Sequence, residues 1–378
     1  MKQTKKTINN HFIQKAFAKN FANNGIIKWT KYQPGEEILE DQTFIINSKD
    51  VSNQPIVIQG FHTQEIEDGM NEIEFEGIKV IRKIAYETNN SLDEKIRLNR
   101  KDIYALKFYK LLSSIRTEKA RSNFENLNGD KLFNYIIKNT DRTPKEIQED
   151  EIKIVIDEYK RWKNKEKLLS HNYDPTKDSL NHKTMIYTLI NNLLNSRLLF
   201  MSFEKNKLFL QETISFQEIY SVAIPIYEFM SISPNVGIMF YFDPAITRGV
   251  INREDSRIFK TKISTKINKV DYVRGKELHE ELDKFMKNKI RLNPGYSQND
   301  LLKWQSLFTA LVSNNYYEEN DVYTYDINKE SEEVQDICNA MSLVHNINKI
   351  LIYQNKEDIK DAEFYVKKLG ISRVEDRE

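Results

Sequence analysis

Hydrophobic positions follow a strand-like pattern near the N-terminus and a helical pattern directly after it. Short runs of apolar, β-branched and aromatic residues occur at 26–32, 43–46 and 55–58, which predicts a small N-terminal sheet. After Thr63, apolar residues instead recur every three or four positions, which predicts a helix with Thr63 as its N-cap. The predicted buried stripe of this helix comprises Ile66, Met70, Ile73, Gly77, Val80, Ile81 and Ile84.

Helical patterning continues through the middle of the chain, from about 91 to 203. Ser91 and Glu94 have the spacing of a capping box, and the Thr-Pro-Lys-Glu motif at 143–146 is a second, stronger helix start. The apolar run at 185–203 contains asparagines and an arginine, whereas a membrane-spanning helix needs about 20 mostly apolar residues. We therefore expect this run to be a core helix.

Strand-like and helical patterns alternate in the remainder of the chain. Strands are predicted at 208–210, 219–226, 236–242 and 350–353, and helices at 300–311, 331–344 and 357–369. The sequence thus predicts an α+β fold, in which a small mixed or antiparallel sheet of N- and C-terminal strands accompanies a central helical region. We expect one compact unit over 1–378, with sub-regions 1–90, 91–205 and 206–378, a basic insertion at 245–293 and C-terminal helices.

Composition narrows the class of protein without naming a reaction. The 57 Lys and Arg residues against 56 Asp and Glu residues leave a net charge of +1, so any attraction to nucleic acid must be local. Cys338 is the only cysteine, so the chain can form no intrachain disulfide or thiolate cluster, which fits a reducing compartment. The N-terminus is basic but has no apolar signal core. We expect a cytoplasmic protein with no membrane partner.

The opening at 11–22 reads His-Phe-Ile-Gln-Lys-Ala-Phe-Ala-Lys-Asn-Phe-Ala. It resembles the opening of an uncharacterised bacterial family, domain of unknown function 4238, which usually reads His-Tyr-Val-Pro-Lys-Phe-Tyr-Leu-Lys-Asn-Phe-Ala. Shorter similarities recur in chain order at 60–63, 70–84, 208–215 and 232–234. The resemblance implies a bacterial protein of the kind found in mobile defence loci, but it implies no reaction.

Three departures from the family pattern indicate a divergent member. Gln14 stands where the family has proline, His62 where it has tyrosine, and Glu212-Thr213 where it has Ser-Asp. If the family's aspartate is functional, Glu212 could replace it only with a shift of one residue. The resemblance therefore leaves open whether the site in this chain is active.

Histidines and carboxylates supply the candidate catalytic and metal-binding groups. We expect His11 in the first turn of a short helix capped by Asn10, where the helix dipole would keep the imidazole neutral, as a general base or metal ligand requires. His62 could join it as a metal ligand. The alternative is that His11 caps or packs against the helix start and that His62 is an ordinary polar residue of a loop.

Glu74 and Glu67 lie at the edge of the apolar stripe that follows Thr63. Two half-buried carboxylates could hold a divalent metal ion or act as acid and base, and Glu212 is the third candidate. The alternative is that each carboxylate pairs with a lysine or arginine. No Gly-x-Ser-x-Gly elbow, Walker loop, Rossmann fingerprint or His-Glu-x-x-His motif occurs, so no complete catalytic motif guides the choice.

The clearest electrostatic feature is the segment 248–276, in which basic residues outnumber acidic ones and alternate with apolar residues. Such a segment could lie along a phosphate backbone, or it could be a solvated insertion. The acidic segment 316–333 could instead dock onto it, within the molecule or in a partner. The candidate nucleic-acid contacts are Lys15, Lys19, Arg257, Lys260, Lys262, Lys266 and Lys269.

Two functions follow from these observations. The first is an antiphage-defence or toxin-type effector that acts on nucleic acid as a metal-dependent nuclease, with His11, Glu74 and Glu212 as catalytic groups and His62 as a metal ligand. The second is a non-catalytic binding or sensor component of a defence complex, which would contact a protein partner through 245–293 or 316–333.

Overall fold

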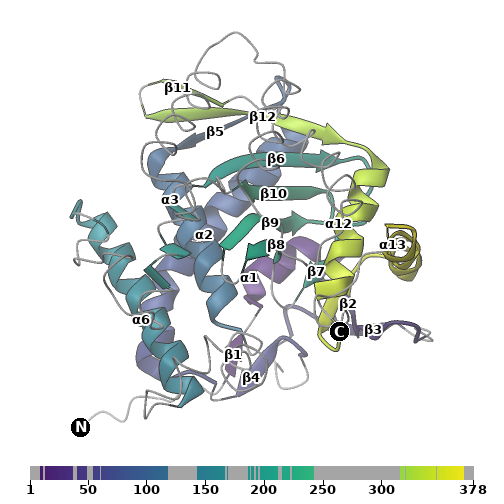
Figure 1. The fold of residues 1–378 in the computed structure, drawn as a ribbon, viewed down its shortest axis with the longest axis horizontal. Coiled ribbons are helices and arrows are strands. Elements are labelled where there is room, and N and C mark those ends of the chain that lie inside the picture. The colour runs from purple at the N-terminus through teal and green to yellow at the C-terminus, as the bar shows by residue number, and fades with distance from the viewer. Residues whose placement is uncertain are drawn as a thin grey trace.

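The structure is a computed structural model. It describes residues 9–11, 13–36, 41–48, 54–59, 61–117, 143–166, 168, 186–187, 189–190, 193–194, 196–211, 215–221, 224–241, 316–319, 321–345 and 347–369. Within these ranges it confirms the predicted α+β fold, with helices packed against sheets (Figure 1). None of the described helices is both long enough and apolar enough to cross a membrane.

The largest described sheet has seven strands. Its order is β11 (Tyr316–Glu319), β12 (Val322–Glu330), β6 (Arg197–Phe203), β10 (Val236–Tyr241), β9 (Ile224–Ser233) and β8 (Ser215–Ser221), and β5 (Lys95–Asn99) also pairs with β12. Neighbouring strands are antiparallel except β12 and β6, which are parallel. This sheet is larger than the small one predicted, because it includes four strands that were not predicted, β5, β6, β11 and β12.

A four-stranded antiparallel sheet joins the two ends of the chain. Its order is β3 (Gln42–Ile45), β2 (Ile26–Lys31), β13 (Ile350–Tyr353) and β7 (Leu210–Gln211). The pairing of β13 with β2, in the register Ile352 to Trp29, confirms that N- and C-terminal strands share a sheet. A separate ribbon pairs β1 (Asn9–His11) with β4 (Val57–Gln59).

The long helices are placed by their apolar faces and by their caps. They are α2 (Gln64–Asn90), α3 (Arg100–Ile115), α6 (Pro144–Lys163), α12 (Glu332–His345) and α13 (Lys356–Leu369), and the short ones are α1 (Lys15–Ala18) and η1 (Lys19–Phe21). In Figure 1, α2 and α3 run across the large sheet, and α6 lies next to them on the left of the view. Helices α12 and α13 lie on the right, at the end of the strands far from α6. The capping box predicted at Thr143 and Glu146 is confirmed.

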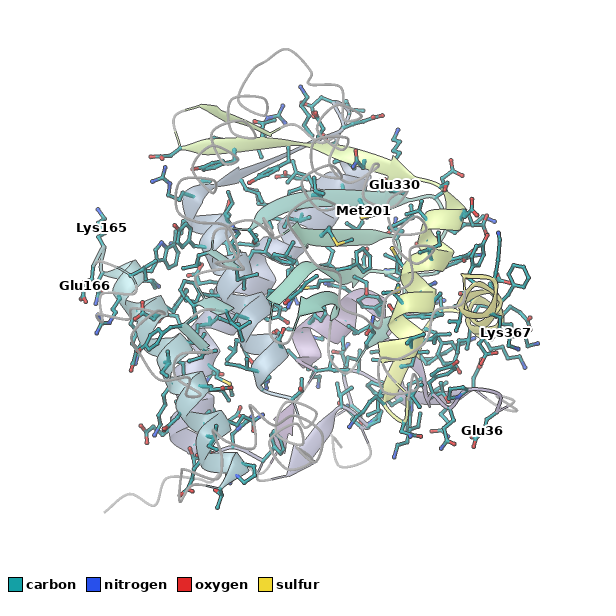
Figure 2. The ribbon with its side chains drawn as sticks, viewed as in Figure 1. Glu36, Lys165, Glu166, Met201, Glu330 and Lys367 are labelled. Carbon is teal, nitrogen blue, oxygen red and sulfur yellow. The ribbon has the colours of Figure 1, made fainter. Side chains whose placement is uncertain are left out.

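The buried stripe predicted for α2 is confirmed, since every residue named for it is buried. Gly77 belongs to this stripe because α3 crosses there: a Cβ at Gly77 would lie 2.2 Å from the Cβ of Tyr109. The largest cluster of buried apolar side chains extends from Ile13 to Ile352 in sequence. In Figure 2, Met201 lies within the large sheet, while the charged Lys165 lies at the periphery.

Two predicted helix starts are wrong. His11 lies in β1, and the first helix begins only at Lys15, with Gln14 as its N-cap. Ser91 ends α2 instead of starting a helix, because α2 continues to Asn90; the next capping box is formed by Asn99 and Asp102, after β5.

The run at 185–203 is not a single core helix, because its last seven residues form β6. Apolar side chains on both faces of β6 are buried, including Leu199 and Phe200. A strand buried on both sides has a continuous apolar sequence, which hydrophobic periodicity does not distinguish from a buried helix. The segment predicted as one strand at 219–226 likewise spans the end of β8 and the start of β9.

Candidate functional site

A buried polar cluster joins α2, the end of α3 and the N-terminal segment. Glu74 of α2 forms an ion pair with the guanidinium of Arg116, the C-cap of α3. Gln14 Nε2 donates a hydrogen bond to Glu74 Oε2 at 2.7 Å. His62, directly before α2, donates through Nε2 to the backbone carbonyl of Arg116 at 3.2 Å. We call Gln14, His62, Glu74 and Arg116 the Glu74 cluster.

The Glu74 cluster is nearly closed to solvent, which makes its charges interdependent. Only 6% of His62, 9% of Glu74 and 4% of Arg116 is exposed. Burial lowers the pKa of Arg116 to about 10, although the negative charge of Glu67 acts to raise it. Arg116 is therefore still cationic at neutral pH. A buried cation needs a counter-charge, and Glu74 supplies it.

Helix α6 also contacts this region, at the C-terminal end of α3. Gln148 of α6 donates through Nε2 to the carbonyls of Ile115 and Thr117, at 2.9 and 2.8 Å. These bonds satisfy backbone acceptors at the C-terminal end of α3, which a helix leaves without intrahelical partners. One turn further along α6, burial raises the pKa of Glu151 to about 8, so Glu151 is mostly protonated at pH 7.

The structure brings two of the predicted site residues together. His62 and Glu74 both contact Arg116. His11 lies in β1, where its backbone pairs with Val57, so the helix-dipole argument for a neutral imidazole does not apply. Glu212 lies outside the described residues. The catalytic roles of His11, Glu74 and Glu212 stay predictions.

The predicted metal site can be compared with the contacts of Glu74. Among the residues that the structure describes, no group of three or more His, Cys, Asp and Glu side chains is arranged to hold a metal ion. Both carboxylate oxygens of Glu74 face protein donors, one from Arg116 and one from Gln14. This matches the alternative stated from the sequence, in which Glu74 pairs with a basic residue. The role of His62 as a metal ligand stays a prediction.

The predicted nucleic-acid contacts are only partly described. Lys15 of α1 is partly exposed and Lys19 of η1 is exposed. The other five, Arg257, Lys260, Lys262, Lys266 and Lys269, lie outside the described residues, as does the whole segment 245–293. The acidic segment 316–333 includes β11 and β12 at the edge of the large sheet.

Sequence reasoning missed two buried lysines on α3. Lys107 donates to the carbonyls of Leu194 and Ser196, at 2.8 and 2.6 Å, and Lys110 forms an ion pair with Glu228 of β9. Burial lowers the pKa of each lysine to about 7. Both lysines lie on α3, which packs against α2, α6 and β5. Lysine in an amphipathic sequence ordinarily indicates the solvent side.

A second missed feature is the solvent side of α2, opposite the apolar stripe. Phe75, Lys79, Arg82 and Tyr86 follow one another there at intervals of three or four residues, and all four are exposed. We call these four residues the α2 outer face. At 100° per residue they lie within about 60° of one another around the helix. Phe75 and Tyr86 are each 70% exposed, which is unusual for aromatic rings.

A comparison of the chain with family models, curated proteins and solved structures finds no match. The resemblance of the opening residues to the uncharacterised bacterial family therefore stays a prediction.

Proposed function

We propose that this chain is a bacterial antiphage-defence or toxin-type effector that binds nucleic acid through the α2 outer face. The observation that carries the proposal is the pair of exposed cations Lys79 and Arg82, neither of which forms an ion pair with any described residue. Phosphate groups are the counter-charges that such a surface favours, because neutralising them releases condensed counterions.

The surroundings of the two cations support this proposal. The acidic residues of α2 nearest to this face are Asp68, Glu72 and Glu76, all on the N-terminal side of Lys79. Gln64 donates a hydrogen bond to Asp68, and Lys163 of α6 pairs with Glu72. The four residues of the α2 outer face thus carry two positive charges and no negative one, although the net charge of the whole chain is only +1.

The proposal has two finer parts, a cytoplasmic location and a metal-dependent nuclease activity. The location is supported by the single cysteine, Cys338, which is free and buried. For cleavage, His11, Glu74 and Glu212 are the candidate catalytic groups. The ion pair of Glu74 with Arg116 argues against Glu74 as a metal ligand, so we give binding, and not cleavage, as the main conclusion.

The test is a titration of labelled DNA and RNA oligonucleotides, followed by fluorescence anisotropy at two salt concentrations. We expect binding that weakens as salt rises. A Lys79→Gln/Arg82→Gln variant should bind more weakly, with a salt slope smaller by about 1.4 for single strands and about 1.8 for duplex DNA. The control variant is Lys329→Gln/Lys360→Gln, which removes two exposed lysines that are already in ion pairs. Parallel incubations with Mg²⁺ and Mn²⁺ test cleavage.

Unchanged affinity of the Lys79→Gln/Arg82→Gln variant would contradict the proposal, and so would an absence of binding to any oligonucleotide. The second result would favour the alternative stated from the sequence, a non-catalytic protein-binding component. Recovery of one stoichiometric protein partner from cells of the source organism would then be the decisive observation.

A further inference from the structure

Two aromatic side chains bracket the two cations of the α2 outer face. Phe75 precedes Lys79 by one turn, and Tyr86 follows Arg82 by one turn. The two rings lie three turns apart, about 16 Å along the helix axis, and differ by about 20° around it. Both rings are largely exposed, at 70% each, so neither gains the stabilisation that burial in a core would give.

Flat aromatic rings and unpaired cations are the two groups that bind single-stranded nucleic acid without regard to sequence. Every base has a π face that can stack on an aromatic side chain, and the cations contact the phosphates. In a duplex, neighbouring base pairs cover those π faces. An aromatic residue on a helix surface can therefore stack only on a base that is unpaired or displaced from its stack.

We infer that the α2 outer face binds single-stranded nucleic acid, with bases stacked on Phe75 and Tyr86 and the intervening phosphates on Lys79 and Arg82. This inference rests on the proposed function and adds the class of nucleic acid. The separation of about 16 Å between the rings exceeds the stacking repeat of about 3.4 Å. The two stacked bases are therefore not adjacent, and the strand passes the cations between them.

The rest of the fold holds this face rigid and sets its borders. The opposite side of α2 carries the apolar stripe, and its Gly77 packs directly on Tyr109 of α3. On one border, Glu72 pairs with Lys163 of α6. On the other, Asn89 accepts a hydrogen bond from Asn235, between β9 and β10, at 2.8 Å. A rigid platform loses little side-chain freedom on binding, because each ring has only two rotatable side-chain bonds.

The experiment measures Kd for a single strand and for a duplex of the same sequence. We expect the wild-type protein to prefer the single strand by tenfold or more. In a Phe75→Ala/Tyr86→Ala variant, single-strand affinity should fall by about fivefold or more for each ring lost, while the salt slope stays unchanged. The control variant is Phe364→Ala, which removes another exposed ring, 60% exposed on α13, and should bind normally.

The outcomes separate this inference from the proposed function. Equal affinity for duplex and single strand, or normal single-strand binding by the Phe75→Ala/Tyr86→Ala variant, would overturn the inference. If Lys79→Gln/Arg82→Gln still weakens binding in that case, the proposed function stands. If no nucleic acid binds, both fail. Because both rings are exposed, the variants should fold normally, and circular dichroism at increasing temperature confirms that before binding is measured.

Discussion

The ion pair between Glu74 and Arg116 predicts a large loss of stability when one charge is removed. In a Glu74→Gln variant, Arg116 would remain cationic, because its pKa of about 10 is well above 7. The guanidinium would then be 96% buried without the carboxylate of Glu74 beside it. The attraction of Glu67, whose charge also acts on Arg116, would remain.

Removing one partner of a buried ion pair costs about 3–5 kcal/mol. Glu67 compensates in part, so we expect a loss near the lower end, about 3 kcal/mol. The free energy of unfolding of an ordinary domain is about 5–15 kcal/mol, so this loss is a large fraction of the total. With a slope of about 3 kcal/mol per molar urea, the unfolding midpoint should fall by about 1 M.

Urea unfolding at pH 7, followed by circular dichroism, measures this effect. The control is Lys329→Gln, which breaks an exposed ion pair with Glu94 and should cost less than about 1 kcal/mol. A Glu74→Leu/Arg116→Met variant replaces both charges by apolar groups and should recover much of the loss, as other buried pairs do. The reasoning is refuted if Glu74→Gln is as mild as Lys329→Gln.

Three further outcomes test the packing and the buried titratable groups. Gly77→Ala should lower the free energy of unfolding by more than about 1–3 kcal/mol, because the new Cβ would overlap Tyr109. Thermal unfolding should show a smaller loss for Gly69→Ala, because its Cβ meets the flexible end of the Ile156 side chain. Glu151 has a pKa raised from 4.5 to about 8 in the folded protein, so its contribution to stability is fully present below pH 4.5 and is lost as pH rises through 8. The urea midpoint of Glu151→Gln should therefore fall less steeply than that of the wild-type protein between pH 5 and 9. The same pH dependence in both proteins would contradict the assigned burial of Glu151. Burial raises the pKa of the Cys338 thiol, so a thiol reagent should react only as fast as the protein unfolds; rapid reaction of the native protein would show that this position is accessible.

Local patterns predicted the buried side of α2 and the start of α6, because their signals lie within a few neighbouring residues. The α2 stripe and the cap at Thr143 required only spacing and side-chain type. The strand β6 was mistaken for a helix because it is buried on both sides, so its sequence does not alternate. The pairing of β12 with β5 and β6 joins distant segments, and no local pattern specifies such partners or their register.

The Glu74 cluster could be predicted only in part, because long-range contacts create it. Glu74 was found from its place at the edge of an apolar stripe, and His62 from its place before the cap. Nothing in the local sequence marks Arg116 as their common partner, since it lies at the end of a different helix. Gln14 was noted only as a departure from a family pattern, whereas in the structure its amide binds Glu74.

The α2 outer face could have been recognised from spacing alone. Phe75, Lys79, Arg82 and Tyr86 repeat at the helical interval on the polar side of a helix that was already predicted. Its exposure, and the absence of ion pairs from the two cations to described residues, required the structure.

Photochemical cross-linking tests most directly whether the α2 outer face contacts nucleic acid. A single-stranded oligonucleotide carrying 5-iodouracil is irradiated with the protein, and mass spectrometry of the digested adduct locates the attachment. We predict attachment at Phe75 or Tyr86, and loss of that adduct when Lys79 and Arg82 are replaced by glutamine. Attachment only at other positions, such as the basic segment 245–293, would contradict the assignment of this face.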